Sequence, residues 1–159
     1  MSPRLLKSVD ERAIQVWRLT AFSINIIVWI AYGGVMYWLD AFRSMTNLQL
    51  LFLCFFCGHA IFTIGIYPKL RWKRWRYMIR GQEVDLQRGV FITEKTLIPM
   101  IRVQHVDVRQ GPFLRYYQLA SVDITTAATT HTIPAIAYED AEYLREQLST
   151  LAQVAVADV

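Results

Sequence analysis

The chain has 159 residues, of which 54% are hydrophobic, so it is too apolar for a disordered chain and has room for one small domain beside a membrane segment. Its formal net charge of +4 is unevenly spread: residues 1–80 carry 11 Lys and Arg against 3 Asp and Glu, a net of +8, and residues 81–159 carry 6 against 10, a net of −4. This distribution excludes a nucleic-acid partner, because the basic footprint of such a protein should lie on its folded domain, whereas here the second half is mildly acidic.

Two uncharged apolar runs predict a transmembrane hairpin over residues 21–67. The first run, Ala21–Leu39, has 19 residues and would be about 28 Å long as a helix, close to the roughly 30 Å of a hydrocarbon core, and the second, Leu48–Tyr67, has 20 residues. The polar link Asp40–Asn47 is short, so the two helices should be antiparallel neighbours. A cleavable signal peptide is the competing interpretation of the first run, but the run is long for such a segment and no Ala-x-Ala site follows it.

Lys and Arg in the short flanks predict that both termini are cytoplasmic. Cations precede the first span and follow the second, whereas the link carries only Arg43, so the positive-inside rule orients the hairpin. The prediction is a multi-pass protein of the inner (plasma) membrane with a cytoplasmic N-terminal segment over residues 1–20. The flanking cations are Arg4, Lys7, Arg12 and Arg18 before the first span, and Lys69, Arg71, Lys73, Arg74, Arg76 and Arg80 after the second.

A basic segment over residues 68–76 is predicted to lie against the anionic lipids of the inner leaflet. Each cation there contributes on the order of 1 kcal/mol of attraction, and Trp side chains suit the headgroup layer. A plain stop-transfer anchor is the alternative, and Pro68 is expected to end or kink the second helix. The candidate membrane-surface residues are Lys69, Arg71, Trp72, Lys73, Arg74 and Trp75.

Polar groups inside the predicted spans are a second set of candidates. Asn25 and His59 are placed about 6 Å and 12 Å from the cytoplasmic ends, which allows a direct or water-bridged contact that would hold a neutral structural histidine. Cys54 and Cys57 have the spacing of a redox pair, but redox chemistry needs a solvent-reachable helix N-terminus. Packing between the two helices is the simpler interpretation of the cysteines.

From Trp75 onward the hydrophobic period changes from that of a helix to that of a strand, which predicts an all-β domain over residues 77–153 with a tail over 154–159. A terminal helix then places Ala137, Ala141, Leu144, Leu148 and Leu151 on one face. Strands followed by one covering helix are typical of a pleckstrin-homology (PH)-like antiparallel barrel or sandwich. The predicted strands are a hairpin over residues 76–90 with its turn at 80–83, then 91–97, 102–108, 119–126 and 130–133.

The segment from Leu86 to Ile136 closely resembles the bacterial PH domain family once called domain of unknown function 304, in particular its YdbS-like two-helix membrane proteins. The matching elements are Ile98-Pro99, the strand of Arg102, Gln104 and Val106, then Gln110-Gly111-Pro112, Arg115, Leu119-Ala120 and Ile133-Pro134-Ala135. Gln118 stands where such proteins usually carry Gly, so the turn is expected to be shaped differently. The resemblance implies a PH-like domain on a membrane anchor, a larger membrane partner with repeated PH-like domains, and no known ligand.

The sequence contains no motif of a common enzyme class, and no cofactor or metal is expected. His105 shares a strand face with Asp107 but is expected to be a partly exposed strand residue. A phosphoinositide pocket is not supported, because the first hairpin turn carries Glu83 rather than a cation cluster. The cations of the signature segment form either a shallow basic rim or ordinary outward-facing positions. The candidate interaction rim is Arg102, Gln104, Arg109 and Arg115.

These observations predict a membrane-anchored, non-enzymatic PH-like module that acts through protein interaction at the cytoplasmic leaflet, in an envelope or stress-related complex. A lipid-binding or lipid-handling component is the alternative, and a transport or redox role is the third. A homo-oligomer is possible.

Overall fold

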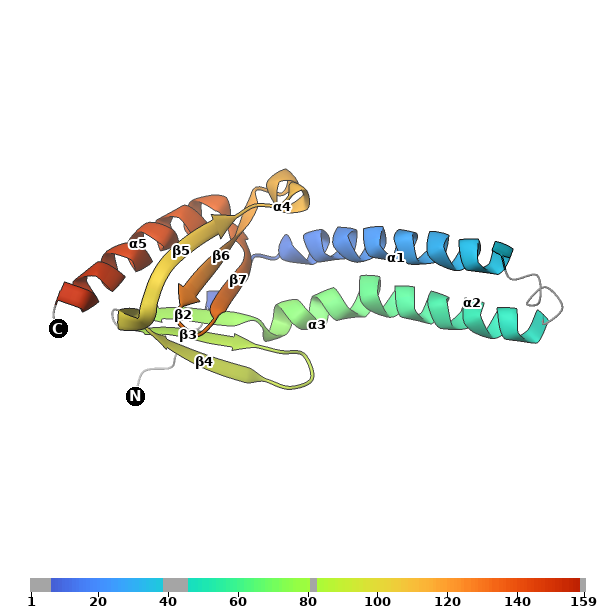
Figure 1. Cartoon of the computed structure of the whole chain (residues 1–159), viewed down its shortest axis with the longest axis horizontal. Coiled ribbons are helices and arrows are strands. Elements are labelled where there is room, and N and C mark those ends of the chain that lie inside the picture. The colour runs from blue at the N-terminus through green and yellow to red at the C-terminus, as the bar shows by residue number, and fades with distance from the viewer. Residues whose placement is uncertain (1–6, 39–45, 81–82, 158–159) are drawn as a thin grey trace. The chain divides into compact units, whose positions relative to one another are not determined.

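The structure, a computed structural model, describes residues 7–38, 46–80 and 83–157 (Figure 1). The described residues form two compact units: Ile14–Lys69 is the helical unit, and the residues up to Ala13 together with those from Leu70 onward form the second, which we call the domain. Most of the predicted link Asp40–Asn47, the centre of the turn at 80–83 and the ends of the N-terminal segment and of the tail lie outside the described residues.

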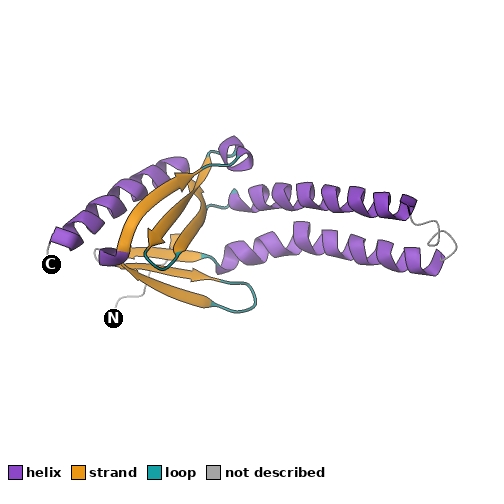
Figure 2. Ribbon diagram, viewed as in Figure 1, coloured by secondary structure: helices purple, strands orange, loops and turns teal. Residues whose placement is uncertain are grey.

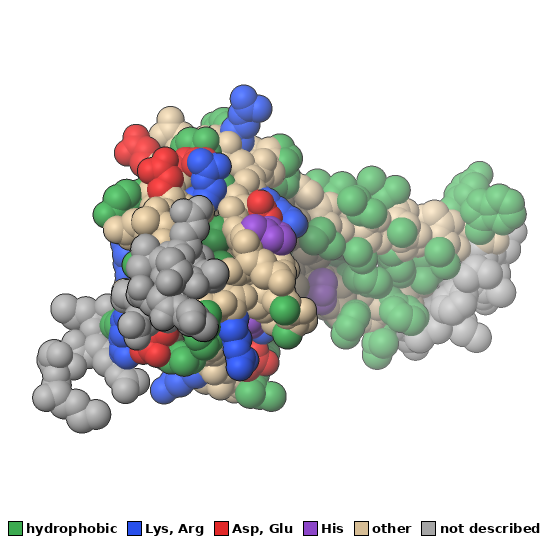
Figure 3. Space-filling view, turned by 60° about the vertical axis from the view of Figure 1, so that its left-hand side comes forward, with side chains coloured by type: hydrophobic (Ala, Val, Ile, Leu, Met, Phe, Trp, Pro, Cys, Tyr) green, Lys and Arg blue, Asp and Glu red, His purple; other side chains and the backbone are tan. Residues whose placement is uncertain are grey.

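The helical unit contains both predicted spans. α1 runs over Ala13–Trp38, and the second span is formed by α2 (Thr46–Ile61), the π-helical turn η2 (Phe62–Ile66) and α3 (Tyr67–Arg74). Helices Ala13–Trp38 and Gln49–Arg74 are each 26 residues long, and an 18-residue window in each has a mean hydropathy of 1.7 and 2.0 respectively, so both are long and apolar enough to cross a membrane. Hydrophobic side chains cover the visible face of this unit in Figure 3.

Pro68 was expected to end or kink the second helix; the helix does not end there, but its regular turn is distorted directly before the proline. The Tyr67 N–H donates to the carbonyl oxygen of Phe62, five residues back, which widens the turn directly before the proline. A proline in a regular helix lacks one donor and its ring meets the carbonyl four residues earlier. The wider π-turn relieves that clash, and the helix extends to Arg74.

Aromatic side chains pack between the two spans. The Tyr32 ring lies 4.9 Å from that of Phe56, and the Trp29 ring lies 5.8 Å from the same partner. The two cysteines, Cys54 and Cys57, are exposed instead. Their predicted role as packing residues between the helices is therefore wrong, because the large aromatic rings fill that interface.

The domain is a sandwich of two antiparallel sheets (Figure 2). Sheet A has the order β1-β2-β3-β4 and sheet B the order β5-β6-β7. The sheets are not closed into a barrel, so the sandwich alternative of the predicted PH-like fold is confirmed. The strands are β1 (Lys7–Ser8), β2 (Arg76–Arg80), β3 (Glu83–Arg88), β4 (Glu94–Pro99), β5 (Val103–Arg109), β6 (Leu119–Thr126) and β7 (Thr130–Ala137).

Strand β1 was not predicted, and it brings the N-terminal segment into sheet A. Lys7 pairs with Tyr77 and Ser8 with Arg76, although the whole helical unit lies between these two strands in the sequence. The Lys7 ammonium also lies 3.0 Å from the Asp140 carboxylate, and that hydrogen bond raises the pKa of Lys7 above its ordinary value. The domain is thus assembled from both sides of the hairpin.

Two short helices and one long helix complete the domain. The 3-10 turn η3 (Met100–Arg102) joins the sheets, and α4 (Pro112–Tyr116) follows β5. α5 (Tyr138–Ala157) packs on η3, β5 and β6, and runs past the predicted end of the domain at residue 153. Its predicted apolar face is buried at Ala141, Leu144 and Leu148, and Glu139 and Asp140 lie in its first turn, where acidic groups favour a helix.

Candidate functional site

The predicted membrane-surface residues fall into two groups. Lys73 and Arg74 are exposed at the end of α3, and Lys69 is exposed at its start. Trp75 is only 5% exposed, because it begins the transition into sheet A, so its ring is in the core of the domain rather than on a surface. Trp72 is half-buried, and its indole N–H donates to the Val9 carbonyl oxygen at 2.9 Å. Arg71 is half-buried as well.

The structure brings the two intramembrane polar residues together. The His59 Nδ1 atom lies 3.3 Å from Asn25 Oδ1, and the Asn25 amide nitrogen donates to Thr63 Oγ1 at 3.1 Å and to the Ala21 carbonyl oxygen at 2.8 Å. Because the Asn25 nitrogen is the donor in two bonds, its oxygen is the atom that faces His59 Nδ1 as an acceptor. The sequence analysis did not single out Thr63, whose hydroxyl completes this network between the two spans.

Little in the described residues points to catalysis or metal binding. His105 Nε2 lies 3.8 Å from the Asp107 carboxylate, and both side chains are more than half exposed. No group of three or more His, Cys, Asp or Glu residues within the described ranges could hold a metal ion.

The predicted interaction rim is divided by strand β5. Arg102 and Gln104 lie at the start of this strand, and Arg109 lies at its end, with Arg115 beyond it in α4. A strand of seven residues spans roughly 20 Å. The four residues therefore do not form one continuous surface, and only Arg109 and Arg115 share the α4 end of sheet B.

Arg109 holds a buried charge and is not a free surface cation. Its Nε atom lies 2.9 Å from Oδ2 of Asp123, whose side chain is 6% exposed while that of Arg109 is 73% exposed. The Thr132 hydroxyl donates to the other carboxylate oxygen of Asp123. Arg109 thus has a structural partner, whereas the Arg115 guanidinium makes no hydrogen bond or ion pair within the described part of the chain.

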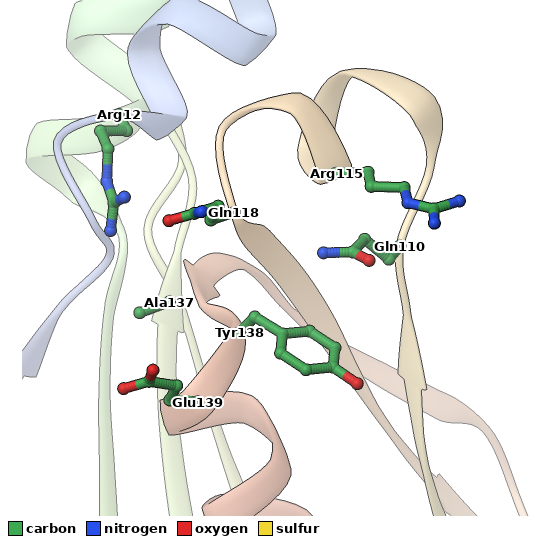
Figure 4. A pocket seen from close by; sticks show the side chains of 7 residues that line it. All are labelled: Arg12, Gln110, Arg115, Gln118, Ala137, Tyr138 and Glu139. Atoms are coloured by element: carbon green, nitrogen blue, oxygen red, sulfur yellow. The ribbon is translucent and has the colours of Figure 1, made fainter.

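Arg115 borders a cleft of about 380 Å³, which we call the α4 cleft (Figure 4). The side chains come from the segment before α1, from the ends of β5, β6 and β7, from α4 and from the start of α5. In the close-up the Arg115 guanidinium points away from the other labelled side chains. The lining residues are Arg12, Gln110, Arg115, Gln118, Ala137, Tyr138 and Glu139.

Backbone hydrogen bonds fix the shape of the α4 cleft. The Tyr138 N–H donates to the Gln118 carbonyl oxygen at 3.1 Å, and the Gln110 side-chain amide donates to the Leu119 carbonyl oxygen at 2.9 Å. Gln118 has a φ of 54°, in the left-handed region that glycine occupies without strain. Glutamine here adopts the conformation that a glycine would favour, so the expected change in turn shape is not required.

Arg12 links the cleft to the start of the first span. It pairs with Asp10 at 3.0 Å and donates to the Tyr117 carbonyl oxygen at 3.3 Å. The hydrogen bond from Arg12 holds the pKa of Asp10 below its ordinary value. From the sequence, Arg12 was identified only as a topology signal, because its place beside residues more than a hundred positions later depends on the fold.

Comparisons with known proteins agree with the architecture. The model of the bacterial PH domain family matches residues 16–152. Over 160 residues the chain is 40% identical to the UPF0699 transmembrane protein YdbS of Bacillus subtilis (strain 168), covering 95% of each protein. Over 81 residues it is 28% identical to the UPF0699 transmembrane protein YdbT of the same organism, covering 48% of this chain and 16% of that relative. No solved structure matches the chain significantly.

Proposed function

This chain belongs to the bacterial PH domain family and is a membrane protein similar to YdbS, and on that premise we propose that it is a non-enzymatic module that binds a partner protein at the cytoplasmic leaflet. The complex is one concerned with the cell envelope or its stress response. We favour protein binding over catalysis because exposed polar side chains of the domain line an open cleft that has an arginine and a tyrosine at its border.

The topology we propose has both spans in the inner membrane and both termini in the cytoplasm. Support comes from the pairing of β1 with β2, since the segments before the first span and after the second must lie on the same side of the membrane. Two crossings achieve this, and the cation bias selects the cytoplasmic side. Reporters fused at residue 1 and after Val159 should read cytoplasmic and one at Ser44 should read outside. A C-terminal reporter on the outside would contradict this topology.

The partner we propose is a larger membrane protein that carries PH-like domains. The similarity to part of YdbT supports this choice, because a region similar to about half of this chain occurs there within a much longer protein. The observation that carries the proposal is the border of the α4 cleft, where Arg115 is exposed and has no hydrogen-bond or ion-pair partner among the residues that the structure describes, and where the neighbouring Tyr116 is 78% exposed. Tyrosine and arginine are the residues most enriched in the energetic centres of protein interfaces.

Co-purification from native membranes tests the partner site. The full chain, tagged at its C-terminus, should retain a PH-like membrane protein that is lost from the Arg115→Glu variant. Arg102→Glu is the matched control, because Arg102 is also exposed and has no partner among the described residues, but lies at the other end of β5. Equal retention by both variants would rule out the α4 cleft as the binding surface.

A lipid-binding component is the second candidate, favoured by the exposed cations of α3. This function does not exclude the first, because Lys73 and Arg74 lie on a different element from the α4 cleft.

A further inference from the structure

The loop between β3 and β4, residues 89–93, exposes two adjacent large apolar side chains. Phe91 is 84% exposed and Ile92 is 80% exposed. Single apolar side chains on a surface are ordinary, but a contiguous pair at the tip of a hairpin is a typical contact point for another phase or molecule.

The loop is built to hold this shape. Gly89 has a φ of +112°, and a Cβ atom at that position would lie 1.8 Å from the Ile92 carbonyl oxygen, so the backbone closes on itself where only glycine fits. At the base of the loop Arg88 pairs in register with Glu94, and their side chains form an ion pair at 2.9 Å. Phe91 and Ile92 are therefore presented by a closed turn.

Strand register places the loop at the end of sheet A from which the chain leads into the spans. β2 begins with Arg76, directly after α3, and Arg76 pairs with Gln87, next to the start of the loop. β1 runs antiparallel to β2 and pairs Ser8 with Arg76, so the chain leaves β1 toward α1 at that same end. The Trp72 indole bonded to the Val9 carbonyl oxygen joins these two connections. The end of the domain that carries Phe91 and Ile92 is thus the end closest along the chain to both apolar helices.

The charges around this end match an anionic lipid surface. Lys95 is exposed on β4, just past the loop, and Lys73 and Arg74 are exposed immediately before β2. Apolar residues flanked by cations are the pattern of segments that lie in the headgroup layer of a membrane.

We propose that the loop of residues 89–93 inserts Phe91 and Ile92 into the boundary between headgroups and acyl chains of the leaflet that faces the domain. The domain then has a contact with the bilayer separate from its two spans, and this contact fixes which surface of the domain faces the membrane. The proposal is independent of the partner site, because it uses none of the α4 cleft residues.

Spin labelling of the full chain in nanodiscs tests the insertion. In a Cys54→Ala, Cys57→Ala background, a nitroxide is attached at Ile92→Cys, or separately at Phe91→Cys, in discs of phosphatidylcholine with phosphatidylglycerol. The control is Ala128→Cys, an exposed position in the turn between β6 and β7. This turn adjoins the start of β5, and β5 follows the end of β4 that lies away from the loop of residues 89–93. For each label we compare its accessibility to oxygen with its accessibility to a water-soluble nickel chelate. We expect the ratio of the first to the second to be severalfold higher at positions 91 and 92 than at the control position.

Two results would overturn the proposal. Labels at positions 91 and 92 that are as accessible to the nickel chelate as the control would show a loop in water. Labels protected from both reagents would show a loop covered by protein instead of lipid. Two label positions guard against one label displacing the loop, and neither result would affect the co-purification expected of Arg115.

Discussion

Replacing Arg109 by Gln should destabilise the domain although the arginine is mostly exposed. The substitution removes the positive group 2.9 Å from the Asp123 carboxylate, which is 6% exposed and is left with the Thr132 hydroxyl. A buried carboxylate that has lost its cation must either remain charged without compensation or take up a proton.

The magnitude lies between two limits. An exposed ion pair contributes about 0–1 kcal/mol, and removing one partner of a fully buried pair costs about 3–5 kcal/mol. Because water reaches the Arg109 side but not the Asp123 side, we expect a loss of about 1.5–3 kcal/mol, the usual contribution of a hydrogen bond to a charged group. Arg109→Glu should cost more, since it places two carboxylates together.

Thermal unfolding of the full chain in detergent, followed by near-ultraviolet circular dichroism, measures this loss. Arg102→Gln is the control and should remain within about 0.5 kcal/mol of the parent, as surface changes do. Combining Arg109→Gln with Asp123→Asn should recover part of the loss, because the uncompensated charge is gone. If Arg109→Gln costs no more than Arg102→Gln, then Arg109 does not compensate the buried charge and the reasoning fails.

Three further variants test other parts of the structure. Tyr77→Phe should change the free energy of unfolding by no more than about 1 kcal/mol, because the buried hydroxyl makes no well-formed hydrogen bond among the described residues and interacts only weakly with the Lys7 ammonium. Burial raises the pKa of Tyr77 above 10.0, so the unfolded chain releases this proton at a lower pH than the folded chain does. The free energy of unfolding therefore falls as the pH rises from 10 through the pKa of the folded state. Melting temperatures measured as a function of pH should show a smaller loss of stability at alkaline pH in Tyr77→Phe. Asn25→Leu should weaken the pairing of the spans by roughly 0.6–1.7 kcal/mol, measured by steric trapping in bicelles, and an unchanged affinity would remove any role for the contact with His59. Lys73→Gln with Arg74→Gln should reduce the phosphatidylglycerol retained on the purified protein, measured by lipid mass spectrometry, whereas undiminished retention would contradict docking on anionic lipid.

Local patterns were sufficient to predict most elements of the fold. β6 has the predicted bounds, since its alternation lies between clear turn signals, and both spans follow from uncharged runs of adequate length. α4 was not predicted, although Pro112 stands at the start of this helix, where proline is common. β1 has two residues and no periodicity of its own, so only its pairing with β2 defines it.

The candidate site was less predictable, because its residues meet only in the fold. Arg115 was identified from the family signature, but its neighbours in the α4 cleft come from five separate elements. The pairing of Arg109 with Asp123 joins adjacent strands, and it depends on the register in which β5 pairs with β6, which no local pattern indicates. Exposure could not be inferred for Trp75 either, because a tryptophan beside cations has the same sequence context at a membrane surface and at the start of a buried strand.

The pairing of β1 with β2 also sets an order of events during synthesis. Lys7 and Ser8 are synthesised long before Arg76 and Tyr77, and in the topology proposed above both apolar helices cross the bilayer before the two strands pair. A chain in which only one helix had crossed would hold its two strands in different compartments, and β2 would keep an open edge of unpaired backbone groups that invites aggregation. In the proposed topology, sheet A therefore cannot be completed in a chain of which only one helix has crossed the membrane.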